Sequence, residues 1–279
     1  MCSEILPRIE GEERGLDKTT GFEVSGVRIG GKEPIIIAGP CTVESEEQTL
    51  TVARAVKAAG IRILRGGAFK PRTSPYSFQG LGEEGLKILK AARDETGLLV
   101  QTEVMDARQI DLVCKYADIL QIGTRNMMNY TLLKAIGEVR FPVMLKRGFM
   151  AKVEELLLAA EYIIKGGNEQ VFLCERGIRS FDNSTRFTLD IAAVPLVKKL
   201  SSLPIIVDPS HATGRADLII PMSLAALAAG ADGVMVEVHP WPKKALCDGL
   251  QSLSLDMFEE FVKKVRAMIK FLTQQNQEQ

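Results

Sequence analysis

A loop with a high density of cations spans residues 64–75 of the 279-residue chain, and its side chains could bind anions. Arg65, Lys70 and Arg72 supply three positive charges, and the hydroxyl of Thr73 adds a neutral donor. Arginine presents a planar fork to a carboxylate or phosphate, whereas lysine presents a point charge. Glycines and prolines in the same loop let the backbone approach a ligand and restrict its conformation. The loop therefore predicts a site for a doubly charged anion.

The elements around this loop alternate regularly between strands and helices. Short apolar segments typical of buried parallel strands occur at 34–38, 61–64, 98–101, 118–123, 142–146, 170–174, 204–207 and 232–236. Segments of helical periodicity separate them, for example at 46–59, 84–95, 152–165 and 189–200. Eight strands alternating with helices over about 240 residues predict an α/β fold of the (β/α)₈ TIM-barrel type. An open doubly wound sheet is the alternative.

The two ends of the chain are expected to lie outside this repeating pattern. Residues 1–21 are polar and aperiodic, which predicts a flexible N-terminal tail. Residues 22–24 and 27–29 alternate around Ser25 and Gly26, as in a two-stranded β-hairpin. We expect a single catalytic TIM-barrel domain over residues 22–273, with the hairpin region 22–33 included, and a disordered tail over 274–279.

Composition excludes several classes of protein. Lysine plus arginine and aspartate plus glutamate both number 35, so the chain lacks the net basicity of a nucleic-acid-binding protein. The sequence has neither a signal-peptide pattern nor an apolar run of about 18 residues, so we expect a cytoplasmic protein without a membrane partner. Five cysteines without paired spacing make disulfides unexpected.

Chemistry in a TIM barrel takes place where strands run into the following loops, so residues at those positions are candidate functional groups. Cations follow the second, fourth, fifth and sixth strands, as Arg65, Arg125, Lys146 and Arg176. Together with Lys70, these side chains could hold the carboxylate and phosphate of one small molecule. Arg72 and Thr73 could hold a second, separate phosphate.

Metal-ligating side chains follow the first, seventh and eighth strands, which are neighbours across the closure of a barrel. Cys41, His211 and Glu237 should therefore converge, and Asp248 could supply a fourth ligand. A thiolate, an imidazole and two carboxylates suit one divalent ion such as Zn²⁺, Fe²⁺ or Mn²⁺. His239 could line the same pocket or orient a ligand. The remaining cysteines are expected to be structural or incidental: Cys2, Cys114, Cys174 and Cys247.

Five motifs carry a resemblance to a known family. They are AGPC (38–41), LRGGAFKPRTSP (64–75), QIGTRN (121–126), DPSH (208–211) and VEVHP (236–240). With them the chain resembles the 3-deoxy-D-arabino-heptulosonate 7-phosphate (DAHP) synthases, type I-beta, from about residue 22 to 271. The resemblance implies a transferase of the shikimate pathway of aromatic amino-acid biosynthesis. Such an enzyme condenses phosphoenolpyruvate with D-erythrose 4-phosphate and water in a metal-dependent, aldol-like reaction, which gives DAHP and phosphate.

The same resemblance assigns roles to individual residues. It implies a divalent metal ion bound by Cys41, His211, Glu237 and Asp248. It places phosphoenolpyruvate on Arg65, Lys70, Arg125, Lys146 and Arg176, and erythrose 4-phosphate on Lys70, Pro71, Arg72 and Thr73. Lys70 or His211 could assist proton transfer. The family also implies a homodimer or homotetramer.

Three rival functions remain open from the sequence. The related 3-deoxy-D-manno-octulosonate 8-phosphate (KDO8P) synthases use arabinose 5-phosphate and carry an Asn-Arg-Ser pattern after the loop lysine. Pro71, Arg72 and Thr73 stand there in this chain, which favours the four-carbon aldose. A Schiff-base aldolase using Lys146 is the second rival, and a non-catalytic phosphosugar-binding relative is the third. The short segments outside the barrel predict that no regulatory domain is appended.

Overall fold

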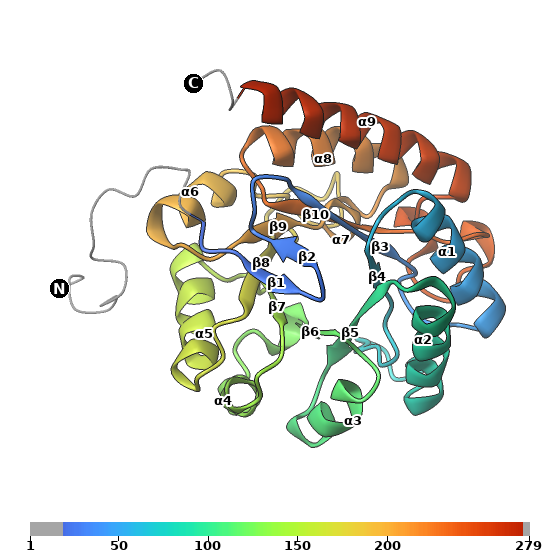
Figure 1. Cartoon of the computed structure of the whole chain (residues 1–279), viewed down its shortest axis with the longest axis horizontal. Coiled ribbons are helices and arrows are strands. Elements are labelled where there is room, and N and C mark those ends of the chain that lie inside the picture. The colour runs from blue at the N-terminus through green and yellow to red at the C-terminus, as the bar shows by residue number, and fades with distance from the viewer. Residues whose placement is uncertain (1–18, 276–279) are drawn as a thin grey trace.

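A closed barrel of eight parallel strands forms the centre of the computed structural model, which describes residues 19–275 (Figure 1). Its strands follow one another around the barrel in the order β10-β3-β4-β5-β6-β7-β8-β9. They are β3 (Ile35–Gly39), β4 (Ile63–Arg65), β5 (Leu99–Val104), β6 (Ile119–Ile122), β7 (Val143–Lys146), β8 (Val171–Glu175), β9 (Ile205–Val207) and β10 (Gly233–Glu237). The pairing of β10 with β3 closes the barrel and confirms the predicted TIM-barrel fold over the open sheet.

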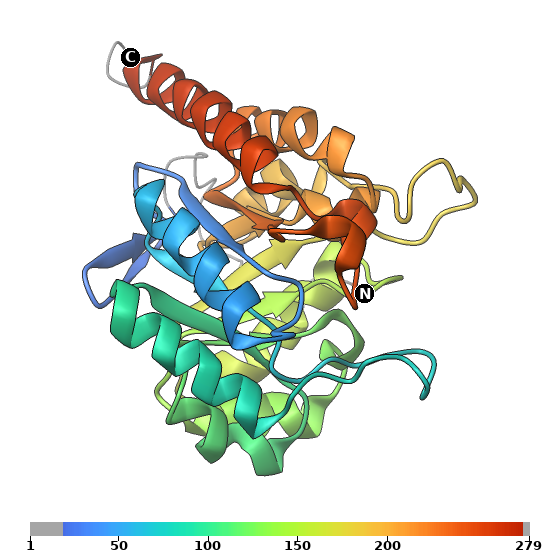
Figure 2. The same ribbon diagram turned by 90° about the vertical axis from the view of Figure 1, so that its right-hand side faces the viewer.

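Helices surround the barrel (Figure 2). They are α1 (Glu46–Ala58), α2 (Glu83–Thr96), α3 (Ile110–Cys114), α4 (Tyr130–Glu138), α5 (Val153–Lys165), α6 (Ala193–Leu200), α7 (Pro209–Thr213), α8 (Ile219–Ala228) and α9 (Leu255–Gln275). All of these except α7 contribute apolar side chains to the core cluster that they share with the strands. Local capping fixes several starts. The Ser45 side chain, for example, accepts a hydrogen bond from the Gln48 backbone N–H at the start of α1.

The predicted hairpin is present as β1 (Phe22–Val24) and β2 (Val27–Ile29), which pair antiparallel. Ser25 and Gly26 both have positive φ angles, as a two-residue hairpin turn requires. The hairpin lies across one end of the barrel in Figure 1. Its buried Ile29 packs with side chains of the barrel interior such as Ile37 and Phe172, so the hairpin closes that end of the core.

Two predicted boundaries, the start of one helix and the start of the C-terminal tail, differ from the structure. Helix α6 begins at Ala193 rather than at residue 189, because Thr188 forms a bridge with Ile178 and Asp190 binds Arg147. These contacts hold the preceding residues outside the helix. Helix α9 continues through Gln275, so the prediction of a tail from residue 274 was wrong for its first two residues.

The remaining predictions about the ends are not tested. Residues 1–18, with Cys2, and residues 276–279 lie outside the described part of the chain. The extent of the single catalytic domain therefore stays a prediction. None of the helices between residues 19 and 275 is long and apolar enough to cross a membrane.

The hairpin's contribution to stability can be tested by truncating Ile29, which is fully buried. We expect Ile29→Ala to lower the free energy of unfolding by about 2–5 kcal/mol, because it leaves a cavity at the closed end of the barrel. Urea denaturation measures the change. Glu23→Ala, on the exposed face of the same hairpin, is the control and should have little effect. An unchanged midpoint for Ile29→Ala would show that the hairpin does not stabilise the barrel.

Candidate active site

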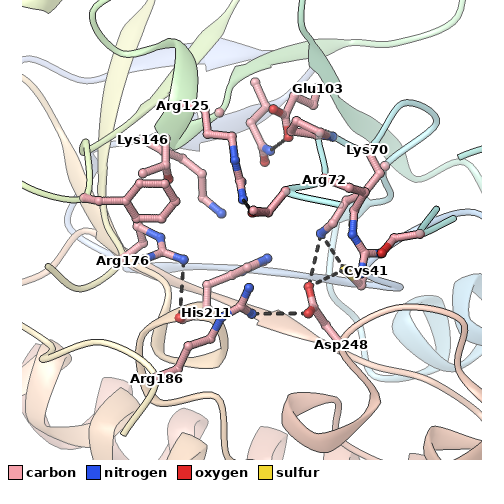
Figure 3. A pocket seen from close by; sticks show the side chains of 18 of the residues that line it. Cys41, Lys70, Arg72, Glu103, Arg125, Lys146, Arg176, Arg186, His211 and Asp248 are labelled. Atoms are coloured by element: carbon pink, nitrogen blue, oxygen red, sulfur yellow. Dashed lines mark hydrogen bonds and ion pairs between the residues drawn. The ribbon is translucent and has the colours of Figure 1, made fainter. Parts of the chain in front are cut away.

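A cavity of about 260 Å³ opens at the carboxyl ends of the barrel strands (Figure 3). Its walls are strongly cationic: they include Arg65, Lys70, Arg72, Arg125, Lys146, Arg176 and Arg186. The predicted substrate-binding residues Pro71 and Thr73 line it too. The structure thus brings all eight predicted substrate-binding residues to one cavity. Small anions are the ligands that such a lining would attract.

A possible metal-binding cluster lies beside these cations. The ligand atoms of Cys41, His211, Glu237 and Asp248 all lie within 4.8 Å of one another. Cys41 follows β3, Glu237 ends β10, and His211 lies in α7 directly after β9. Asp248 adopts a left-handed backbone conformation (φ 53°), which is uncommon for a residue other than glycine. The four predicted ligands therefore meet as a compact mixed set of sulfur, nitrogen and oxygen donors.

The orientation of His211 is fixed by two carboxylates. Its Nδ1 lies 2.6 Å from Asp208 Oδ2, and its Nε2 lies 3.1 Å from Glu237 Oε1. Asp208 also accepts a hydrogen bond from the His211 backbone N–H at the start of α7. Burial lowers the pKa of His211 to about 4, which favours the neutral imidazole. A neutral imidazole that donates from Nδ1 to a carboxylate keeps an unprotonated Nε2, which here faces Glu237 and could bind a metal together with it.

The thiol of Cys41 contacts three polar neighbours. Its Sγ lies 2.8 Å from Lys70 Nζ, 3.2 Å from Asp248 Oδ2 and 3.5 Å from Cys247 Sγ. Burial raises the pKa of Cys41 well above its ordinary value, and Cys247 and Glu237 raise it further, whereas Lys70 opposes the shift. A bound divalent cation would favour the thiolate instead. The donor set therefore fits a metal such as Zn²⁺, Fe²⁺ or Mn²⁺.

Cys247, which was expected to be structural or incidental, lies beside the predicted metal ligands. Besides its contact with Cys41, it accepts a hydrogen bond at 3.0 Å from Arg72 Nη1, so it joins the metal ligands to the anion-binding loop. Its position next to Asp248 in the sequence was the available signal. Cys174 is buried within β8, and Cys114 is half-buried at the end of α3.

Two buried cations are tied to the metal cluster by carboxylates. Arg65 Nη1 donates to Glu237 Oε1 at 2.9 Å and to the Pro40 carbonyl at 2.8 Å. Lys146 Nζ donates to Asp208 Oδ2 at 2.6 Å, the same oxygen that holds His211. Because these ion pairs are buried, they fix the positions of both cations. They also make the metal ligands and the anion pocket one connected network.

Several residues of this network received no role in the sequence analysis. Glu103 is the penultimate residue of β5, and its burial raises its pKa although Lys70 and Lys146 oppose the shift. Gln251 donates to Glu237 Oε2 at 2.7 Å. Arg186 Nη1 binds Asp248 Oδ1 at 3.2 Å and thereby orients this ligand. Glu103 lies near a strand end. Arg186 lies in an irregular segment and Gln251 in a short 3₁₀ helix (Gly249–Gln251), and the barrel pattern gives no signal for either.

His239 does not join the cluster. Its Nε2 lies 3.2 Å from Glu44 Oε2, and its Nδ1 accepts a hydrogen bond from the Trp241 backbone N–H. These contacts occupy both ring nitrogens. His239 therefore orients neighbouring loop segments and is not one of the four clustered ligands.

Comparisons with known proteins agree with this geometry. The model of the DAHP synthetase I family matches residues 12–274. The chain is 53% identical over 249 residues to the phospho-2-dehydro-3-deoxyheptonate aldolase of Thermotoga maritima. The matched region covers 89% of this chain and 74% of that protein. A crystal structure of the Thermotoga maritima enzyme matches with a TM-score of 0.89 at 52% identity, over 92% of this chain and 75% of the other.

A more distant group of relatives carries a different name. The 2-dehydro-3-deoxyphosphooctonate aldolase of Syntrophotalea carbinolica is 32% identical over 266 residues, which is 88% of this chain and 95% of that protein. The family model thus matches almost the whole of this chain. The same chain contains the barrel, the mixed cluster of possible metal ligands and the cationic loop. This chain belongs to the DAHP synthetase I family.

Proposed function

We propose that the chain catalyses the condensation of phosphoenolpyruvate with D-erythrose 4-phosphate and water, which yields DAHP and inorganic phosphate. The observation that carries this proposal is that four possible metal ligands lie next to a cavity lined by cations. Two phosphorylated substrates and an aldehyde that must be polarised would need both features. The name of the Thermotoga maritima relative supports the same reaction.

Phosphoenolpyruvate carries a carboxylate and a phosphate, and the cavity offers two kinds of cation for them. Arg65 and Lys70 lie next to the metal ligands, so we assign the carboxylate to them. Arg125 and Arg176 line the same cavity, and within residues 19–275 neither has a carboxylate at ion-pair distance. We assign the phosphate to these two arginines, together with Lys146. Unneutralised guanidinium groups bind phosphate strongly because each can donate two parallel hydrogen bonds.

Arg72 and Thr73 would bind the phosphate of the aldose. They lie in the loop after β4, and Thr73 Oγ1 accepts a hydrogen bond from Arg125 Nη2 at 3.3 Å. This contact supports a second phosphate site beside the first. The aldehyde end of erythrose 4-phosphate would then extend towards Cys41 and Asp248.

In the proposed reaction a bond forms between C3 of phosphoenolpyruvate and C1 of the aldose, water adds at C2, and phosphate leaves by C–O cleavage. A divalent ion held by Cys41, His211, Glu237 and Asp248 would supply Lewis-acid polarisation of the aldehyde oxygen. Lys70 Nζ lies 2.8 Å from Cys41 Sγ and 3.2 Å from Asp248 Oδ2. Burial lowers the pKa of Lys70, but surrounding anionic groups outweigh burial and raise it. We therefore propose that the Lys70 ammonium donates a proton to the developing alkoxide.

The Schiff-base alternative receives less support from the geometry. A nucleophilic lysine must present a neutral amine to a carbonyl group. Lys146 Nζ instead forms a buried ion pair at 2.6 Å with Asp208. This ion pair engages the Nζ that a Schiff base would need, and the side chain suits anion binding. We further propose that the chain acts in the cytoplasm as a homodimer or homotetramer, in keeping with the family resemblance.

Substrate choice tests the proposed function directly. We expect the purified, metal-loaded protein to consume phosphoenolpyruvate with erythrose 4-phosphate at a kcat/KM at least about tenfold higher than with arabinose 5-phosphate. The physical reason is that the loop carries Pro71, Arg72 and Thr73 at the aldose phosphate. The decrease of enolpyruvate absorbance measures both rates. Preference for the pentose would reassign the chain to the octulosonate reaction.

Metal dependence can be tested through Cys41. We expect Cys41→Ser to reduce the bound metal and to lower kcat by about 100-fold or more, because a hydroxyl is a far weaker metal ligand than a thiolate. Elemental analysis of the purified protein and the same absorbance assay measure the two effects. Cys114→Ser, in helix α3, is the matched control and should keep both metal and activity. Full metal content and activity in Cys41→Ser would reject the proposed metal site.

A further inference from the structure

Arg176 is a buried arginine that has no acidic partner within residues 19–275. Only 3% of its surface is exposed, and its side-chain hydrogen bonds are long ones, at 3.4 Å to the Gly177 and His211 carbonyl oxygens. Its Nε has no hydrogen-bond partner in the same part of the chain. A buried charge without compensation is costly, so something else must stabilise this guanidinium. Arg65 and Lys146 differ from it, because each is paired with a carboxylate.

Two aromatic rings take the place of the missing acid. The Arg176 Cζ lies 4.1 Å from the ring centroid of Phe187 and 5.0 Å from that of Phe149. The two rings are stacked, with centroids 5.1 Å apart and an interplanar angle of 12°. Arg125 also lies over Phe149, at 5.3 Å. Both arginines that we assign to the phosphate of phosphoenolpyruvate therefore rest on one aromatic pair.

The fold holds these rings in place from two separate loops. Phe149 follows β7, and its carbonyl accepts a hydrogen bond from the Arg179 backbone N–H at 2.7 Å. The backbone N–H of Phe187 donates to the Ala212 carbonyl at 2.8 Å. Gly177 has a φ of 86°, and a Cβ there would lie 2.8 Å from Phe187 Cβ. The turn after β8 is thus shaped to let Phe187 reach the arginine.

We propose that Phe149 and Phe187 are positioning residues that orient Arg125 and Arg176 for the phosphate of phosphoenolpyruvate without neutralising them. The face of an aromatic ring attracts a guanidinium through its quadrupole and carries no net charge. A carboxylate in the same place would also fix the arginines, but it would compete with the substrate phosphate. The aromatic pair leaves the guanidinium donors available to the anion. This inference rests on the proposed function.

The test distinguishes the contribution of the aromatic ring face from that of simple packing. We expect Phe187→Leu and Phe149→Leu each to weaken phosphoenolpyruvate binding about tenfold, because leucine fills space but has no quadrupole. Phe187→Tyr keeps a ring face and should restore most of the affinity. Isothermal titration calorimetry on the metal-loaded protein, without aldose, measures the dissociation constants. Phe181→Leu is the matched control, because Phe181 lies in the same loop with its side chain fully exposed.

Steady-state kinetics and a double variant complete the test. The leucine variants should raise the KM for phosphoenolpyruvate while kcat and the KM for the aldose stay close to those of the parent. In an Arg176→Met background, Phe187→Leu should weaken binding by clearly less than tenfold, because its main partner is absent.

The outcomes distinguish this inference from the proposed function on which it rests. Equal affinity of the parent and the leucine variants, or equal losses in Phe187→Leu and Phe187→Tyr, would overturn the positioning role alone. A folded, metal-loaded parent that binds no phosphoenolpyruvate would overturn the proposed function and this inference together.

Discussion

The hydrogen-bonded closure of the barrel between β10 and β3 is the constraint on which the site depends. It pairs Glu237 with Gly39, residues nearly two hundred positions apart, and so brings the end of the last strand beside Cys41. Strand β9 pairs with β10 on its other side and delivers His211 at the start of α7. No local segment could assemble these ligands. Their meeting follows from a parallel sheet that has no free edge.

Four of the cations in the cavity form two groups that differ in their partners. Arg65 and Lys146 are buried in ion pairs with Glu237 and Asp208, which also contact His211. Removing one partner of such a pair leaves an unpaired buried charge, which commonly costs about 3–5 kcal/mol. The possible metal ligands and these cations therefore stabilise one another.

The second group, Arg125 and Arg176, lies against aromatic faces instead of acids. Burial lowers the pKa of Arg176 to about 10, still well above neutrality, so its guanidinium stays charged. A cation that is fixed in place but not neutralised retains its attraction for an incoming phosphate. One cavity thus combines cations that are paired with carboxylates and cations that lie against aromatic rings. The fixed cations reduce the reorganisation needed when substrate binds.

The sequence by itself determined the element types, the barrel and most of the candidate site. Apolar strand segments and helical periodicity are local patterns, and residues directly after a parallel strand must lie at one end of a barrel, as Cys41 and Glu237 do. Tertiary structure alone decided the contacts of Arg186, Cys247 and the stacked Phe149 and Phe187. These residues lie in irregular loops, whose paths depend on contacts with other loops rather than on a repeating pattern. The start of α6 depended on the tertiary structure for the same reason, since a distant arginine binds Asp190.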